Sequence, residues 1–343
     1  MRFTALLVTL ALILPVFGCS PDEPAPIDEE GALVIYSGRR DVLVDPLVER
    51  FHEATGIEVE VRYGNDAELL AAIQEEGDAS PADIFWGNTA GALGAAASAG
   101  LLAQLPDSIL SRPAAEFVPS SGLWMPASVR FRVMAYNPQV VTEDQLPVSV
   151  LDVPGMTDFN GRLGWTPGYS SFQDFVTTLM LTQGEDSTRA WLNGVKALEP
   201  NTYPSNTPML EAMVAGEIDV ALTNHYYVHR VLSRLDSTEA PSVAIHRFAA
   251  GDAGNLALVT GAGVLATSGR QTAAHRFLSF LLSQEAQEFV VATLFEYPVI
   301  ESTPLGEEFM PFDEARSMGP EIDFEELREL ERTLTLLREE ELL

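Results

Sequence analysis

Ala32-Leu-Val-Ile-Tyr-Ser37 has the apolar pattern of a buried strand, and the residues after it decide the fold class. Apolar side chains follow at helical spacing over residues 43–51, and Gly56 supplies the residue type that most often ends a helix. Residues 57–63 then alternate apolar and charged side chains, as a half-buried strand does. Such alternation of strands and helices predicts an α/β fold with mainly parallel sheets and ligands at the carboxyl ends of strands.

The same patterns continue along the chain. They predict helices over residues 68–75, 172–181, 189–198, 208–215, 271–282, 284–294 and 324–342, and strands over 82–86, 131–136, 219–223 and 262–266. A chain of 343 residues suits two domains of ordinary size. We expect a first α/β lobe from residues 32–130 plus 258–305 and a second from 131–257 plus 306–343, with the ligand site in the cleft between them.

The first 19 residues differ from the rest. A single Arg2 precedes an apolar run that is too short to span the ~30 Å hydrocarbon core comfortably, which is typical of a secretory signal. Val16-Phe-Gly-Cys19 resembles a bacterial lipobox, in which cleavage leaves a lipid-modified cysteine. We therefore expect a signal peptide over 1–19, lipidation of Cys19, an acidic tether over 20–31, and an exported protein held to the membrane only by its lipid. The alternative is a chance cysteine beside an ordinary cleavage site.

Composition excludes several classes of function. The net charge of −30 argues against binding nucleic acid or anionic lipid through a basic surface. Cys19 is the only cysteine, so an intramolecular disulfide and a cysteine metal site are both excluded. The sequence contains no Gly-rich phosphate loop, nucleophile elbow or paired-carboxylate motif, which favours a binding protein over an enzyme.

Tyr226 and Tyr227 follow the strand 219–223 and stand where a helix is predicted to begin. Adjacent residues on a strand point to opposite faces, so the two phenols converge only if the chain turns there. A phenol is neutral at pH 7, but a bound, highly charged cation displaces its proton, and a hard metal such as ferric iron favours oxygen donors. The alternative is that the tyrosines pack in the core and donate to carbonyl groups.

Eight segments in order along the chain resemble the periplasmic ferric-iron-binding proteins of ABC transporters. They are Val34-Ile-Tyr-Ser-Gly-Arg39, Phe51-His-Glu-Ala-Thr-Gly-Ile57, Glu76-Gly-Asp-Ala-Ser-Pro-Ala-Asp-Ile-Phe85, Ala99-Gly-Leu-Leu102, residues 124–137 with Arg130 and Arg132, Phe159-Asn-Gly-Arg-Leu-Gly-Trp165, Asn224-His-Tyr-Tyr227 and Glu296-Tyr-Pro-Val299. Each segment alone is weak, but the ordered set is specific. The resemblance implies a two-lobed, type II periplasmic-binding-protein fold and a monomer that delivers Fe³⁺ to a membrane permease driven by an ATPase.

The resemblance also implies a ligand set. Tyr226 and Tyr227 would bind Fe³⁺ as phenolates, leaving one positive charge that a synergistic anion, carbonate or phosphate, would neutralise. The positions that match the anion-binding residues of the family are Arg130, Asn206, Asn224, Ser170 and Ser171.

Three positions depart from the family pattern. Tyr169 is either a third phenolate ligand or part of the pocket wall. Arg40 and Asn88 stand where some members have a histidine and a glutamate ligand. Arg40 cannot bind a metal, so it holds the anion or is solvated. Asn88 offers a carbonyl oxygen to the metal or stabilises a turn.

Two other functions remain open. The same fold serves many ligands, so the cargo is alternatively a small organic or oxyanion solute such as thiamine, a polyamine or a phosphonate. His225 and His229 have the spacing of a two-histidine metal pair on one helix face, which would suit a secreted metal-dependent hydrolase. No third ligand for such a site is identifiable in the sequence.

Overall fold

The computed structural model describes residues 31–235 and 242–343. The expected signal peptide, Cys19 and all but the last residue of the expected tether lie outside these ranges. Within them, no helix combines the length and the apolarity needed to cross a bilayer.

The first lobe is built on the parallel strands β2 (Val59–Tyr63), β1 (Leu33–Ser37) and β3 (Ile84–Gly87). Strand β9 (Ala257–Val264) pairs antiparallel with β3 and brings a distant part of the chain into the sheet. The helices of this lobe are α1 (Asp41–Thr55), α2 (Asp66–Glu76), α3 (Ala90–Ser98), α4 (Asp107–Leu110), α9 (Gln271–Leu281), α10 (Gln284–Phe289) with a π-helical turn (Val290–Leu294), and α11 (Phe312–Ser317).

The predicted end of α1 is confirmed. Gly56 adopts the left-handed conformation, with φ of 70°, and its N–H donates to the carbonyl of His52. Within the helix, Leu47 and Phe51 are buried in the core of the lobe. A glycine is favoured at position 56 because other residues populate this backbone region poorly.

The second lobe begins at β4 (Met125–Tyr136), which pairs on one side with β7 (Val220–Asn224) and on the other with β8 (Ala244–His246). Beyond β7 lie β5 (Leu163–Trp165) and then β6 (Asn201–Thr202). Strands β5, β6 and β7 are mutually parallel, so their carboxyl ends meet at one edge. The helices of this lobe are α5 (Ser170–Gln183), α6 (Glu185–Lys196), α7 (Asn206–Val214) and α8 (His225–Leu232).

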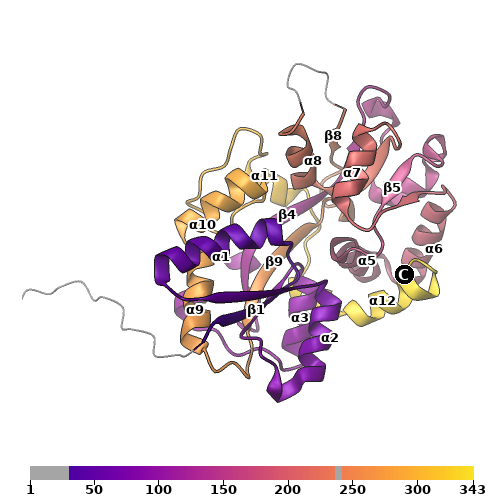
Figure 1. The fold of residues 1–343 in the computed structure, drawn as a ribbon. Coiled ribbons are helices and arrows are strands. Elements are labelled where there is room, and N and C mark those ends of the chain that lie inside the picture. Colours follow the sequence, from indigo (N-terminus) through magenta and orange to yellow (C-terminus); the bar gives the residue numbers. More distant parts are fainter. Residues whose placement is uncertain (1–30, 236–241) are drawn as a thin grey trace, which may run out of the picture.

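Strand β4 connects the two lobes. Its first part, to Phe131, pairs with β9, and its last part, from Arg132, pairs with β7. The hydrophobic cores separate at the same point, since Phe131 belongs to the first core and Met134 to the second. Figure 1 shows β4 and β9 crossing between the two groups of helices. Arg130 and Arg132 therefore stand at the junction of the lobes.

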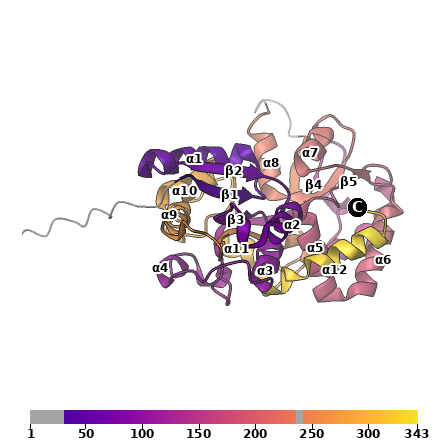
Figure 2. The same ribbon diagram turned by 60° about the horizontal axis from the view of Figure 1, so that its bottom comes forward.

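The C-terminal part differs from the expectation. Residues 306–343 were expected in the second lobe, but Phe309, Ala315 and Leu327 lie in the first core. Leu336 and Leu337 of the final helix lie in the second core, and Ile322 packs against both. The expected helix over 324–342 is instead a 3₁₀ turn (Phe324–Arg328) followed by α12 (Leu330–Glu339). Figure 2 shows α12 running from α3 along α5 toward α6, so the end of the chain contacts both lobes.

Two glycines of α3 allow the 3₁₀ turn to approach that helix closely. A Cβ atom at Gly91 in α3 would lie 2.8 Å from the carbonyl oxygen of Leu327, and one at Gly94 would lie 3.1 Å from Cβ of Arg328. The 3₁₀ turn thus packs directly on the backbone of α3, which keeps residues 324–328 with the first lobe.

Candidate metal centre

The tyrosine pair lies in the first turn of α8. Asn224, the last residue of β7, has extended dihedral angles, and the helix starts at the next residue. The turn brings the rings of Tyr226 and Tyr227 to 4.1 Å between centroids, with 32° between their planes. Their side chains are 1% and 3% exposed. The turn expected from the sequence is therefore present, and both phenols lie in the interior.

A third phenol joins them. The hydroxyl oxygen of Tyr169, which directly precedes α5, lies 3.0 Å from that of Tyr227. Burial, together with the nearby Tyr226, raises the pKa of Tyr169 to about 12, and burial with neighbouring phenols also raises the pKa of Tyr227 well above its ordinary value. Both phenols are therefore neutral at pH 7 until a cation displaces their protons.

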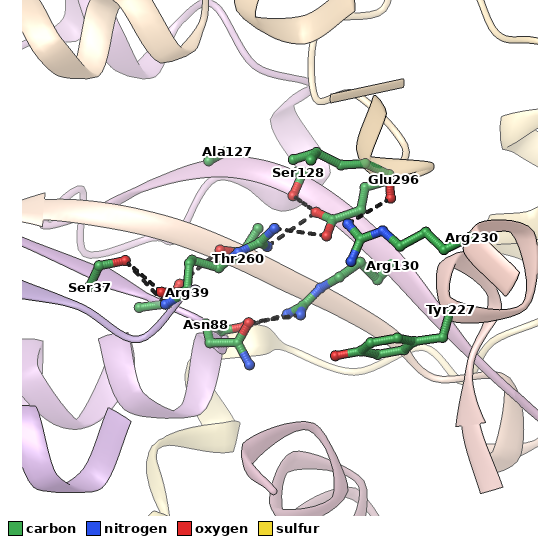
Figure 3. A network of polar contacts seen from close by, with 12 residues as sticks. Ser37, Arg39, Asn88, Ala127, Ser128, Arg130, Tyr227, Arg230, Thr260 and Glu296 are labelled. Atoms are coloured by element: carbon green, nitrogen blue, oxygen red, sulfur yellow. Dashed lines mark hydrogen bonds and ion pairs between the residues drawn. The ribbon is translucent and has the colours of Figure 1, made fainter. Parts of the chain in front are cut away.

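Arg130 and Asn88 form the first-lobe side of the site. The fully buried Arg130 donates from Nη1 to Oδ1 of Asn88, at 3.0 Å, and from Nη2 to the carbonyl of the same residue. Nδ2 of Asn88 donates to Oγ of Ser170 across the cleft, at 2.7 Å. In Figure 3 the hydroxyl end of Tyr227 points toward Asn88 and Arg130. The carbonyl oxygen of the Asn88 side chain, a candidate metal ligand, thus already accepts from Arg130.

Asp66 fixes the backbone beneath Asn88. Its carboxylate accepts from the N–H of Asn88, at 2.9 Å, and from Oγ1 of Thr89, at 3.0 Å. A Cβ atom at Gly38 would lie only 1.7 Å from Oδ1 of Asp66, so this position requires glycine. Burial raises the pKa of Asp66 to about 6, although these hydrogen bonds oppose the shift.

Glu296 belongs to the buried polar network around Arg39 and Arg130, although sequence reasoning did not assign it a role. Arg39 donates to both of its carboxylate oxygens, at 3.1 Å and 2.8 Å, and Ser128 donates to one of them (Figure 3). Burial alone would raise the pKa of Glu296, but the charges of Arg39 and Arg130 outweigh it and lower the pKa to about 2. Glu296 and Arg39 both occur in the quoted segments, but their pairing across 257 positions has no local signal.

Polar atoms without partners gather in the second lobe. Within the described residues, the atoms without a hydrogen-bond partner at the carboxyl ends of β5 and β7 and in the first turns of α5 and α7 are Oγ1 of Thr166, Oγ of Ser171, both amide atoms of Asn206 and Nδ2 of Asn224. On the adjacent strand β4, Nη2 of Arg132 also has no partner. Buried polar atoms normally have partners. Helix starts and free donors together suit an anion.

Arg40 lies at the edge of the cleft. Its Nη1 donates to Oγ1 of Thr207 in the opposite lobe, at 3.1 Å. Its side chain lines two cavities, one of about 330 Å³ beside Tyr169 and Ser170, and one of about 770 Å³ beside Tyr227. The structure thus gives Arg40 an inter-lobe hydrogen bond.

The histidine pair is surrounded by aromatic rings. The N–H of Phe131 donates to Nδ1 of His225, at 3.1 Å, and the ring of His229 stacks on Phe295 and Phe309. Burial lowers the pKa of His225 to about 3. Over residues 31–235 and 242–343, no group of three or more His, Cys, Asp or Glu side chains has an arrangement that holds a metal. The histidines are thus packed among rings from both lobes.

Known proteins share this sequence and fold. The family model described as bacterial extracellular solute-binding protein matches residues 46–313. The "Fe(3+)-binding periplasmic protein" of Serratia marcescens is 33% identical over 270 residues, covering 78% of each chain. "Iron uptake protein A1" of Synechocystis sp. is 30% identical over 91% of this chain and 88% of its own.

Among solved structures, iron-bound HitA from Pseudomonas aeruginosa has a TM-score of 0.84 at 32% identity, covering 90% of this chain and 98% of that one. This likeness confirms the expected two-lobed, type II periplasmic-binding fold. The chain belongs to the bacterial extracellular solute-binding protein family.

Proposed function

We propose that this exported protein captures Fe³⁺ outside the cytoplasm and delivers it to an ABC importer. The single observation that carries the proposal is the cluster of three phenols, in which the hydroxyl oxygens of Tyr169 and Tyr227 lie 3.0 Å apart and the ring of Tyr226 lies 4.1 Å from that of Tyr227. The printed names of the relatives, an Fe(3+)-binding periplasmic protein and an iron uptake protein, support the same cargo.

The phenols suit ferric iron for electrostatic reasons. Three neutral hydroxyl groups in a buried site neither repel one another strongly nor attract monovalent cations. A trivalent ion displaces their protons, and three phenolates then balance its charge. Tyr226 and Tyr227 are the proposed ligands from α8, and Tyr169 is the proposed third ligand. The carbonyl oxygen of Asn88 faces Arg130, so we assign Asn88 to positioning rather than to the metal.

Carbonate or phosphate completes the proposed site. Ser170, Ser171 and Asn206 stand in the first turns of two helices, and Asn224 ends the neighbouring strand. Both amide atoms of Asn206, Nδ2 of Asn224 and the hydroxyl of Ser171 have no partner among the described residues and are available to an oxyanion. Arg130 adds positive charge from β4. An anion placed here lies between the helix starts and the phenols.

Closure of the lobes would retain the ion. Asn88 bonds to Ser170, and Arg40 bonds to Thr207, each across the cleft. Strands β4 and β9 and the link between the 3₁₀ turn and α12 connect the lobes and would bend as they move. We assign 32–130 plus 258–328 to the first lobe and 131–257 plus the final helix to the second. We further propose a monomer, tethered through a lipid on Cys19, that binds a permease and its ATPase without catalysing a reaction itself.

Thermal denaturation of the chelator-stripped protein with a panel of candidate solutes tests the cargo. The panel contains ferric citrate, citrate alone, thiamine, a polyamine and a phosphonate. The proposal predicts that the midpoint temperature rises with ferric citrate and not with citrate alone, since only a ligand of the folded state stabilises it. A rise with one of the organic solutes and none with ferric citrate would transfer the assignment to that solute.

A further inference from the structure

Arg230 lies over the faces of the two tyrosine rings. Its guanidinium carbon is 4.7 Å from the ring centroid of Tyr226 and 5.9 Å from that of Tyr227. Both distances fall within the ~6 Å reach of a cation–π interaction. All three residues belong to α8, and residues three or four positions apart lie on the same face of a helix. The sequence spacing therefore places the cation against both rings.

The same guanidinium contacts the opposite lobe. Nη2 of Arg230 donates to the carbonyl of Leu294, at 3.1 Å. Leu294 is the last residue of the π-helical turn and lies in the core of the first lobe. Carbonyl groups at the end of a helix lack partners within it and carry partial negative charge, which favours a cation there. Arg230 thus joins the tyrosine rings of the second lobe to the backbone of the first.

The charge of Arg230 is not neutralised by an acidic side chain. In the ranges 31–235 and 242–343, no carboxylate forms an ion pair with it. Arg39, by contrast, forms a two-point ion pair with Glu296. Figure 3 shows the side chain of Arg230 extending from the helix that carries Tyr227. Its positive charge is therefore available to the aromatic rings.

Arg130 acts on the phenols from another direction. Its positive charge lies close enough to interact with Tyr169, Tyr226 and Tyr227, and the hydroxyl end of Tyr227 points toward it (Figure 3). Both of its terminal nitrogens donate to Asn88 within the first lobe. Arg230 instead contacts the ring faces and bonds across the lobes. The two arginines therefore have separate roles.

We propose that Arg230 is a positioning residue that stabilises the phenolate forms of Tyr226 and Tyr227 when the lobes are closed around iron. The inference rests on the proposed function, because these phenols lose their protons only to a bound cation. Three phenolates balance the charge of Fe³⁺, so the accompanying anion leaves the loaded centre negative. A cation against the ring faces offsets that charge. Opening of the lobes would break the bond to Leu294 and release the guanidinium.

Visible spectra of the ferric complex test this inference. Chelator-stripped wild type, Arg230→Gln and Arg230→Lys are each titrated with ferric citrate in the presence of bicarbonate. A cation against a phenolate ring lowers the energy of the electrons that move to iron in the tyrosinate-to-iron transition. We expect the band of Arg230→Gln to move to longer wavelength and its iron affinity to fall about tenfold. Arg230→Lys keeps the charge and should keep the band near its wild-type position.

Arg234→Gln is the matched control. Arg234 is exposed and lines the same cavity of about 770 Å³ as Arg230. The cation–π contacts found among the described residues do not include it. Loss of this charge should leave both the band and the iron affinity at their wild-type values.

A band at the wild-type wavelength in Arg230→Gln would overturn the inference. Equal shifts in Arg230→Gln and Arg230→Lys would also overturn it, since the residue would then act through its shape and not its charge. Circular dichroism establishes that each variant is folded. If Arg230→Gln does not fold, Arg230→Lys decides, because a displaced band in that variant contradicts an action through charge. A wild type without a band refutes the proposed cargo and this inference together, whereas a wild-type band that Arg230→Gln leaves unchanged refutes the inference alone.

Discussion

The hydroxyl oxygens of Tyr169 and Tyr227 lie 3.0 Å apart, although the two residues are separated by 58 positions in the chain. The contact joins the start of α5 to the start of α8, so two helix N-termini of the second lobe present phenols to the same point. It makes Tyr169 part of the proposed metal centre and not of a distant pocket wall.

Replacement of Tyr169 by phenylalanine tests this assignment. We expect the Tyr169→Phe protein to fold normally and to bind Fe³⁺ at least about tenfold more weakly, which corresponds to a loss of ~1.4 kcal/mol or more. Competition against a chelator of known affinity measures the change. Tyr203→Phe is the control, because that half-buried tyrosine lies outside the phenol cluster. Equal affinity in wild type and Tyr169→Phe would exclude the third phenolate.

Iron binding should release protons. Tyr169 has its pKa raised to about 12 and Tyr227 has its pKa raised well above the ordinary value, so both are protonated in the free protein at neutral pH. Each phenol that binds as phenolate makes the apparent affinity fall about tenfold per unit decrease in pH. Three ligands predict a slope of about three for log affinity against pH between about pH 6 and 8, after correction for the competing chelator. A pH-independent affinity would contradict phenolate ligation.

The buried ion pair between Arg39 and Glu296 should contribute strongly to the free energy of unfolding. Glu296→Gln leaves Arg39 buried without its anion, and we expect a loss of about 3–5 kcal/mol in the free energy of unfolding. The matched control Glu285→Gln removes the exposed partner of Arg50 and should cost less than about 1 kcal/mol. Urea denaturation measures both variants. A similar small cost in each would show that the buried pair contributes little.

The same carboxylate predicts a dependence on acid. The pKa of Glu296 is lowered to about 2 in the folded protein, below the 4.5 of an unperturbed glutamate. Its contribution to stability is therefore fully present above about pH 4.5 and is lost as the pH falls toward 2. The difference in unfolding free energy between wild type and Glu296→Gln should shrink over this range, and a constant difference would contradict the assignment.

Hydrogen bonds across the cleft should slow iron release. Ser170→Ala removes the 2.7 Å bond from Asn88, and Thr207→Ala removes the 3.1 Å bond from Arg40. We expect faster release in both, with the larger effect in Ser170→Ala because its bond is partly buried and the other is exposed. Stopped-flow transfer of iron to a chelator gives the rates. Unchanged rates in both variants would mean that these bonds do not hold the lobes closed.

Sequence patterns predicted much of the framework. The strand and helix from Leu33 to Thr55 and the junction at Asn224 follow from periodicity and end signals, which are local. The first half of β4 was not predicted, because Ser128 and Arg130 interrupt an apolar pattern although both are buried. The 3₁₀ turn before α12 packs against glycines of α3, a long-range contact that no local pattern encodes.

The site was predicted only in part. The tyrosine pair has a local signal, namely two phenols at the start of a helix. Glu296 has none, since it is paired with a residue 257 positions away. The partner of Arg130 has no local signal either, because Asn88, which accepts from both of its terminal nitrogens, lies 42 positions away. The partner of a buried charged side chain is therefore decided by contacts that form only in the folded chain.

The most direct test of the central claim is a visible-absorption titration of the purified, chelator-stripped protein with ferric citrate in the presence of bicarbonate. The account predicts a saturable tyrosinate-to-iron band in the wild type and in Tyr203→Phe, and its loss in the Tyr226→Phe/Tyr227→Phe double variant. No band in the wild type, or an undiminished band in the double variant, would contradict ferric capture by these tyrosines.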